Sequence, residues 1–193
     1  MRPDILNRGY RPWIKAMFAL FRAFSGHPLP DVARLTFYRP DFYGTTAKRF
    51  THAALRGPSP WSVADRELIA AYVSHLNACA FCVGAHTAIA ERAYGDDTKV
   101  RAVLTDLESA PIEEGLRATL RMLDTLMRTE TVGVEDMRKL LSAGVSRPQI
   151  EDALAVCAAL DTANRLADSF DFDLPSPAGF AAGAGYLLKR GYR

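Results

Sequence analysis

The stretch that decides the fold is WSVADRELIAAYVSHLNACAFCVGAH, residues 61–86. Near its start a serine is followed three residues later by an aspartate, which is typical of a capped helix start. The apolar residues after this pair predict a helix over residues 63–76. Asn77 is a poor interior helix residue and a good cap, so it is expected to end this helix and to begin a second one, from residue 78 or 79 to about residue 94. An antiparallel turn at this point would fold the two helices back on one another.

Apolar residues at intervals of three and four predict helices over most of the remaining chain as well. The expected ranges are Pro12–Gly26, a short helix after Asp31, Phe42–Leu55, Asp97–Leu107, Glu113–Met127, Val134–Ala143, Arg147–Phe170 and Ala178–Lys189. Alternating runs bounded by hairpin turns do not occur, so strands are not expected. The predicted fold class is all-α.

The length of 193 residues suits one domain. Within it we expect an N-terminal helical extension over about residues 1–57, a core with the CxxC sequence over about 58–110, and a C-terminal helical half over about 111–193. A weak internal similarity at a shift of 84 residues, with Glu67 opposite Glu151, leaves open whether the bundle contains a degenerate repeat.

Charge and hydropathy exclude several classes of function. The chain carries 24 basic and 22 acidic side chains, so no broad basic field points to nucleic acid. No apolar run approaches the ~18 residues that cross a bilayer, and the longest apolar stretch near the N-terminus, Ala16–Phe21, is too short for a signal peptide. The expectation is a cytoplasmic protein that binds neither nucleic acid nor membrane.

Residue types suited to thiol chemistry gather around the predicted turn. On a helix, Cys79, Cys82 and His86 fall within ~60° of arc, and Glu67 would be brought back towards them by the turn. Only the thiolate of a cysteine attacks, and a helix N-terminus or a neighbouring imidazole favours it. A carboxylate can orient the imidazole, and the second thiol can resolve the oxidised first one as a disulfide.

Three other interpretations of these residues stay open at this point. Free cysteine packs as a small hydrophobe, which is the expected role of Cys157 within LAVCAAL. Cys79, Cys82 and His86 with a carboxylate would also suit zinc, although no second CxxC completes such a site. The third interpretation is a redox sensor whose cysteine pair oxidises once and does not turn over.

The pattern Glu–x11–Cys–x2–Cys–x3–His resembles the AhpD-like alkylhydroperoxidase branch of the carboxymuconolactone decarboxylase superfamily, and the surrounding residues resemble its peroxidase-related members. A second block, ALDTANRLADSFDFDLP, resembles the downstream segment of the family, with Asn164 and Arg165 as its Asn-Arg pair. The decarboxylase branch lacks the cysteine pair, so decarboxylation is not what these residues suggest.

The resemblance implies an AhpD-like helical bundle that assembles as a homo-oligomer, a dimer, trimer or hexamer. It implies an antioxidant peroxidase that reduces small hydroperoxides with electrons from a dithiol protein or small thiol, without a cofactor or metal. By position, Cys82 would be the peroxidatic nucleophile, Cys79 the resolving thiol, His86 the base and Glu67 the supporting carboxylate. Phe81 stands where related peroxidases have histidine, and because a phenyl ring cannot pass protons, a simpler proton relay is expected.

Overall fold

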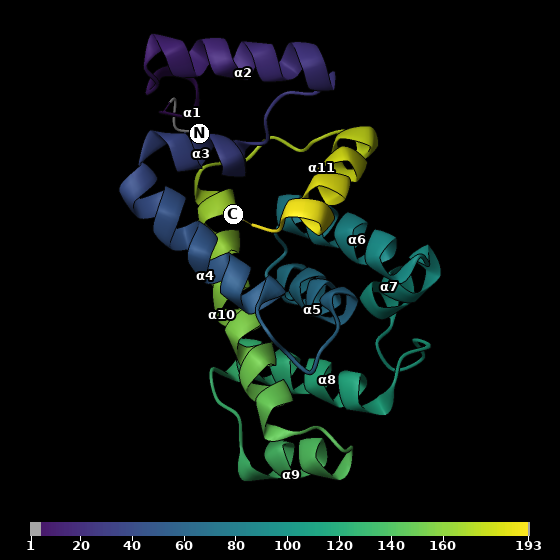
Figure 1. The fold of residues 1–193 in the computed structure, drawn as a ribbon. Helices are drawn as coiled ribbons and strands as arrows, with labels where there is room; N and C mark the ends of the chain where they lie inside the picture. The colour runs from purple at the N-terminus through teal and green to yellow at the C-terminus, as the bar shows by residue number, and fades with distance from the viewer. Residues whose placement is uncertain (1–4, 193) are drawn as a thin grey trace.

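The structure, a computed structural model, describes residues 5–192, and in this range helices joined by short loops make up the chain (Figure 1). In chain order the elements are α1 (Ile5–Arg8), α2 (Pro12–Ser25), α3 (Asp31–Tyr38), η1 (Pro40–Gly44), α4 (Thr45–Arg56), α5 (Val63–Leu76), α6 (Ala80–Tyr94), α7 (Asp97–Thr105), α8 (Glu114–Thr129), α9 (Val134–Ser142), α10 (Arg147–Ser169) and α11 (Pro177–Arg190). The described part of the chain contains no strand, so the all-α prediction is confirmed.

Most predicted helix boundaries agree with the structure to within two residues. The larger differences lie near the N-terminus, where the short helix α1 was not predicted. The segment Pro40–Gly44 forms a π-helical turn that runs directly into α4, which delays the start of that helix to Thr45. The second helix of the central pair starts at Ala80, one or two residues later than expected, so Cys79 lies at its N-cap.

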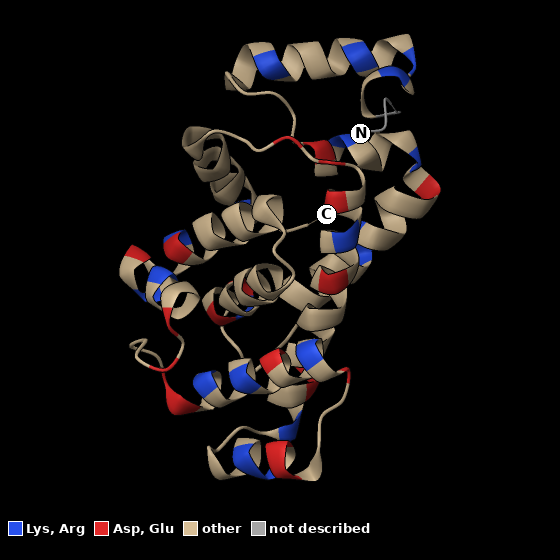
Figure 2. Cartoon of the chain, turned by 180° about the vertical axis from the view of Figure 1, so that it is seen from behind, with Lys and Arg blue, Asp and Glu red and all other residues tan. Residues whose placement is uncertain are grey.

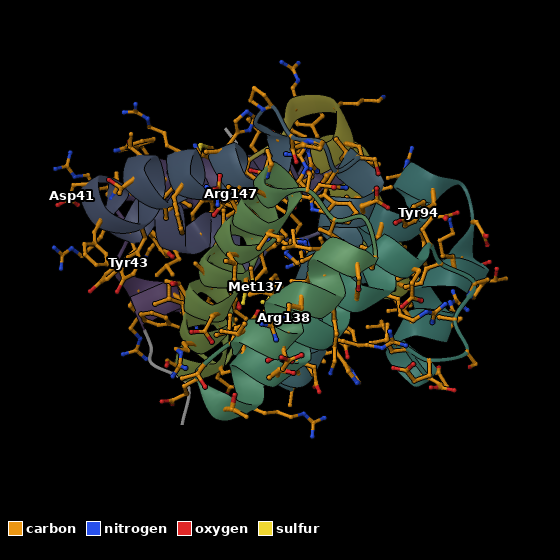
Figure 3. The ribbon with its side chains drawn as sticks, turned by 90° about the horizontal axis from the view of Figure 1, so that it is seen from below. Asp41, Tyr43, Tyr94, Met137, Arg138 and Arg147 are labelled. Atoms are coloured by element: carbon orange, nitrogen blue, oxygen red, sulfur yellow. The ribbon has the colours of Figure 1, made fainter. Side chains whose placement is uncertain are left out.

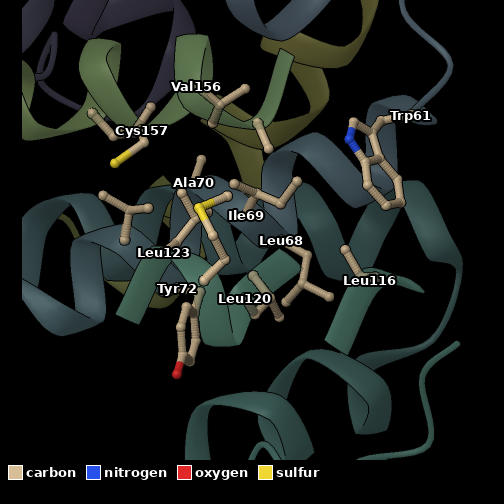
Figure 4. Packing of buried hydrophobic residues seen from close by; sticks show 14 of the residues in the cluster. Trp61, Leu68, Ile69, Ala70, Tyr72, Leu116, Leu120, Leu123, Val156 and Cys157 are labelled. Carbon is tan, nitrogen blue, oxygen red and sulfur yellow. The ribbon is translucent and has the colours of Figure 1, made fainter. Parts of the chain in front are cut away.

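Helix α5 lies at the centre of the molecule, packed against α6, α8 and α10 (Figure 1). Its residues Glu67 to Ser74 are buried without interruption. A helix buried on all sides needs surrounding protein both to cover its apolar residues and to pair its buried polar ones, here Glu67 and Ser74. Its neighbours supply a continuous core: Leu68 and Ile69 of α5 pack with Leu120 and Leu123 of α8 and with Val156 of α10 (Figure 4).

A second, smaller apolar cluster covers the two cysteines of the central turn. It joins Cys79 and Cys82 to Leu6 of α1, Leu35 of α3 and Phe172, which follows α10. Leu6 is completely buried and Leu35 is 3% exposed. The N-terminal helices therefore contribute to the surroundings of the cysteines, rather than forming a separate appendage.

Helix α2 lies on the outside of the bundle, at the top of Figure 1. Ile14 is buried, but Phe24 is 85% exposed and Leu20 is 58% exposed. The apolar stripe of this helix is thus only partly covered within one chain. The homo-oligomer inferred from the family resemblance remains a prediction.

Helices α5 and α10 begin 84 residues apart, at the shift noted in the sequence. Each starts with a capping box, Ser62 with Asp65 in α5 and Ser146 with Gln149 in α10. Asp161 corresponds to Asn77 at this shift and lies inside α10, so α10 continues where α5 ends. The structure therefore repeats the helix start but not the break and the second helix of the pair.

Charged side chains of both signs are interspersed over α8 and α9 at the lower end of the molecule, whereas α2 carries only basic ones (Figure 2). Among residues 5–192, no helix combines the length and the hydropathy needed to cross a bilayer.

Candidate functional site

The turn between α5 and α6 sets the geometry of the site. Asn77 caps α5, Ala78 takes a left-handed conformation with φ of 54°, and Cys79 becomes the N-cap of α6. The backbone N–H of Cys79 donates to the carbonyl of Ser74 at 3.0 Å, which closes the turn. A left-handed alanine costs ~1–2 kcal/mol, so surrounding contacts must hold this conformation.

Contacts far from this turn keep α5 and α6 together. At the far end of α6, the hydroxyl of Tyr94 donates to Asp65 Oδ1 at 2.5 Å, at the first turn of α5. Tyr94 lies at the opposite edge of the molecule from Asp41 and Tyr43 (Figure 3). Helix α11 packs against the middle of α6, where a Cβ on Gly84 would come within 2.7 Å of the Phe180 ring.

Glu67 and His86 form a direct hydrogen bond across this helix pair. The distance from His86 Nδ1 to Glu67 Oε2 is 2.6 Å, Glu67 is completely buried, and His86 is 7% exposed. Burial acts to raise the pKa of Glu67, but the charge and hydrogen bond of His86 and the charge of Arg56 outweigh it and hold this pKa below its ordinary value. Because an ionised carboxylate only accepts hydrogen bonds, His86 donates through Nδ1, and Nε2 is the ring nitrogen that does not face Glu67 Oε2.

Two residues that the sequence analysis did not identify bind the other carboxylate oxygen. Arg56 Nη1, at the end of α4, lies 2.6 Å from Glu67 Oε1, and the hydroxyl of Tyr192 donates to the same oxygen at 2.9 Å. These residues stand 11 and 125 positions away from Glu67. No local spacing pattern links them to the motif, so sequence reasoning had no signal for either.

Cys79 and Cys82 are free thiols, with 0% and 5% of their surfaces exposed. Hydrogen bonding with the Cys82 thiol is the main influence that lowers the pKa of Cys79, against burial and the carboxylate of Asp168, which act to raise it. The same hydrogen bond and burial raise the pKa of Cys82. The first ionisation of the pair therefore places the charge on Cys79, at the N-cap of α6, while the resemblance assigns the nucleophilic role to Cys82.

The four predicted site residues thus form two pairs, Glu67 hydrogen-bonded to His86 and the free thiols of Cys79 and Cys82 in one apolar cluster. Cys82 and His86 are one helical turn apart on α6, a spacing that places side chains on the same face. Within residues 5–192, neither thiol hydrogen-bonds to the imidazole. Substrate or solvent would have to bridge the two pairs for the imidazole to act on a sulfur.

Other sequence candidates lie outside this arrangement. Cys157 is buried in the main core, 3.6 Å from the sulfur of Met127, and burial raises the pKa of its thiol to about 11. Phe81 is 8% exposed, and its ring packs edge-on against Phe172 at a centroid distance of 5.3 Å. In the described part of the chain, no three His, Cys, Asp or Glu side chains are placed to hold a metal ion together.

A surface hollow with a volume of about 760 Å³ lies between the end of α5 and helices α7, α8 and α9. Neither Cys79 nor Cys82 lines it. His75 is exposed and lines this hollow. The thiol pair, in contrast, lies under the apolar side chains of the second cluster.

Comparisons with known proteins agree with this architecture. Residues 40–125 match the model of the carboxymuconolactone decarboxylase family. An uncharacterized peroxidase-related protein from Silicibacter sp. TM1040 has a similar structure, with a TM-score of 0.74 and 21% identity over 91% of each chain. A protein described as an alkylhydroperoxidase AhpD core, from Ralstonia eutropha JMP134, gives a TM-score of 0.73 and 22% identity over 95% of this chain and 91% of its own.

A third similar structure is the debrominase Bmp8 in its apo form, with a TM-score of 0.69 and 18% identity over 90% of this chain and 92% of that one. A search of the curated proteins finds no match. The TM-scores establish a shared fold, and the family match runs from η1 into α8, including the turn with both cysteines. Residues 40–125 are therefore similar to the carboxymuconolactone decarboxylase family, and the chain as a whole has the AhpD-like helical fold.

Proposed function

We propose that this protein is a thiol-dependent peroxidase that reduces small organic hydroperoxides through Cys79 and Cys82. The observation that carries the proposal is the placement of two free thiols at the N-terminus of α6, one turn before a histidine in a buried Glu67–His86 hydrogen bond of 2.6 Å. Nucleophile, base and orienting carboxylate are the parts that an activated thiol requires.

The hydrogen bond between the sulfurs lets the charge of the ionised pair reach either atom. When the Cys82 proton moves along this bond to Cys79, Cys82 becomes the thiolate and Cys79 the neutral thiol. Cys82 is also the thiol one turn from His86. The assignment of Cys82 as nucleophile and Cys79 as resolving thiol requires this transfer.

The proposed reaction begins with attack of the Cys82 thiolate on the distal oxygen of the hydroperoxide. The O–O bond breaks, Cys82 becomes a sulfenic acid, and protonated His86 gives its proton to the departing alkoxide. Cys79 then attacks the sulfenic sulfur, which forms a disulfide and releases water. An external dithiol reduces this disulfide by exchange, so that one hydroperoxide and one dithiol become an alcohol, water and an oxidised dithiol.

The apolar surroundings of the thiols support an organic substrate. Leu6, Leu35, Phe81 and Phe172 lie in one cluster with both sulfurs. Such a lining favours an alkyl group over bulk water. Because both sulfurs are almost inaccessible, substrate entry requires side chains of this cluster to move.

Turnover of an alkyl hydroperoxide with a dithiol reductant tests the proposal. We expect activity in the parent, loss of turnover in Cys82→Ser and Cys79→Ser, and parental activity in Cys157→Ser, since Cys157 lies in the main core. Mass spectrometry after one equivalent of hydroperoxide should find a Cys79–Cys82 disulfide. Parental turnover in either of the first two variants would refute the mechanism, and one oxidation without turnover would point instead to a redox sensor.

A further inference from the structure

The C-terminal end of the chain folds back onto the Glu67–His86 pair. Helix α11 ends at Arg190, and Gly191 adopts a φ of 66°, which turns the chain towards α4. The backbone N–H of Tyr192 donates to His52 Nδ1 at 3.3 Å. A Cβ on Gly191 would lie 2.6 Å from the His52 ring, so both the backbone conformation and the available space require glycine here.

This turn brings Tyr192 into contact with three members of the buried charge network. Its hydroxyl donates to Glu67 Oε1 at 2.9 Å, and its ring stacks on the His86 imidazole with a centroid distance of 6.3 Å and an interplanar angle of 25°. The Arg56 guanidinium lies over the same ring, 5.0 Å from its centroid. Tyr192 therefore contacts the carboxylate, its cationic partner and the imidazole that the carboxylate orients.

The division of hydrogen bonds over Glu67 shows what Tyr192 contributes. Arg56 and Tyr192 share Oε1, which leaves Oε2 for His86. Without these donors at Oε1, the carboxylate would be free to rotate and to exchange its oxygens. Burial and the charge of Glu67 raise the pKa of Tyr192 well above its ordinary value, so the phenol keeps its proton and stays a donor.

We propose that Tyr192 is a positioning residue of the site, which with Arg56 fixes the rotamer and the ionised state of Glu67 and so orients His86. The effect of Tyr192 on turnover rests on the proposed peroxidase function, in which His86 is the base. Its effect on Glu67 does not, because that coupling is a property of the resting protein.

Tyr192→Phe tests the proposal, because it removes the hydroxyl and keeps the ring that stacks on His86. The pKa of Glu67 is measured from its side-chain carboxyl carbon by NMR, with the signal assigned from Glu67→Gln. We expect this pKa to rise by about one pH unit, since a hydrogen bond to the charged carboxylate is lost. Tyr186→Phe is the matched control, because Tyr186 lies on α11 and is 60% exposed, and it should leave the titration unchanged.

A second variant displaces the Tyr192 hydroxyl without altering the tyrosine itself. Gly191→Ala displaces the chain end through its clash with His52, so it should also raise the pKa of Glu67. Gly183→Ala is its control, since a Cβ at that position meets no atom within 4 Å. Parental titration in both Tyr192→Phe and Gly191→Ala would overturn the proposal.

Turnover measurements distinguish the positioning role of Tyr192 from the proposed peroxidase function. In Tyr192→Phe we expect kcat for hydroperoxide to fall about tenfold with KM unchanged, because the hydroxyl acts on Glu67 and not on the substrate. Parental kcat in this variant would overturn the positioning role. A raised pKa of Glu67 in the variants, together with no turnover in the parent, would refute the peroxidase function while supporting the coupling of Tyr192 to Glu67.

Discussion

Glu67→Gln should destabilise the folded protein severely, because it removes the charge from the centre of the buried network. The carboxylate is completely buried and has Arg56 and His86 nitrogens 2.6 Å from its two oxygens. Removing one partner of a buried ion pair leaves the other charge uncompensated and costs ~3–5 kcal/mol. Glutamine keeps the shape and one acceptor, so we expect ~3 kcal/mol, a large part of the ~5–15 kcal/mol that stabilises a typical domain.

The pH dependence of this loss follows from the direction of the Glu67 pKa. The folded-state pKa of Glu67 lies below its ordinary value. The stabilisation of the folded state by the ionised Glu67 is therefore complete above the unfolded-state pKa, which is ~4.3. It is lost as the pH falls through the folded-state pKa. The difference in unfolding free energy between the parent and Glu67→Gln should therefore shrink as the pH falls below ~4.

Urea denaturation at fixed protein concentration measures this difference, and a double-mutant cycle identifies its source. Arg56→Met alone leaves the carboxylate without its cation, so it should also be costly. In the double variant Arg56→Met/Glu67→Gln, neither charge remains, so the combined loss should be smaller than the sum of the single losses by ~2 kcal/mol. A loss below ~0.5 kcal/mol for Glu67→Gln, or strictly additive losses, would refute the account of a buried charge network.

Two further predictions concern the thiols and the packing of α6. The pH midpoint of Cys79 alkylation should rise in Cys82→Ala, which removes the thiol donor that lowers the pKa of Cys79, and should rise less in Cys82→Ser, which keeps a hydroxyl donor. Cys157 should stay unreactive near neutral pH. Equal midpoints in the parent and Cys82→Ala would contradict this reasoning. In thermal unfolding, Gly84→Ala should lower Tm, because the clash of its Cβ with a phenyl ring of α11 costs ~1–3 kcal/mol and exceeds the helix-propensity gain of ~1 kcal/mol. Gly183→Ala has open space around its Cβ and should raise Tm. A higher Tm in both variants would show that the ring moves aside freely.

The fold was predictable from the sequence because its elements depend on local signals. The capping box of Ser62 and Asp65, the break at Asn77 and the apolar spacing between them act over a few residues, and α5 ends where Asn77 indicates. The proximity of Glu67 and His86 was also within reach, because an antiparallel turn folds one predicted helix onto the next. Within this central helix pair, only the exact start of α6, with Cys79 as its N-cap, needed the structure.

The environment of the site depended on contacts between distant parts of the chain. Tyr192 and Arg56 reach Glu67 from the chain end and from α4, and no periodic pattern connects them to the motif. The burial of both thiols beneath Leu6 and Leu35 likewise comes from N-terminal helices that pack over the turn.

The sequence by itself determined which helices form and which chemical groups the central turn carries, because backbone capping and apolar periodicity are local properties. Only the tertiary structure decided how those groups are charged, held and covered. Ionisation and access depend on the partners and the burial that packing supplies, and in this protein those partners lie more than a hundred residues away as well as within a few turns of helix.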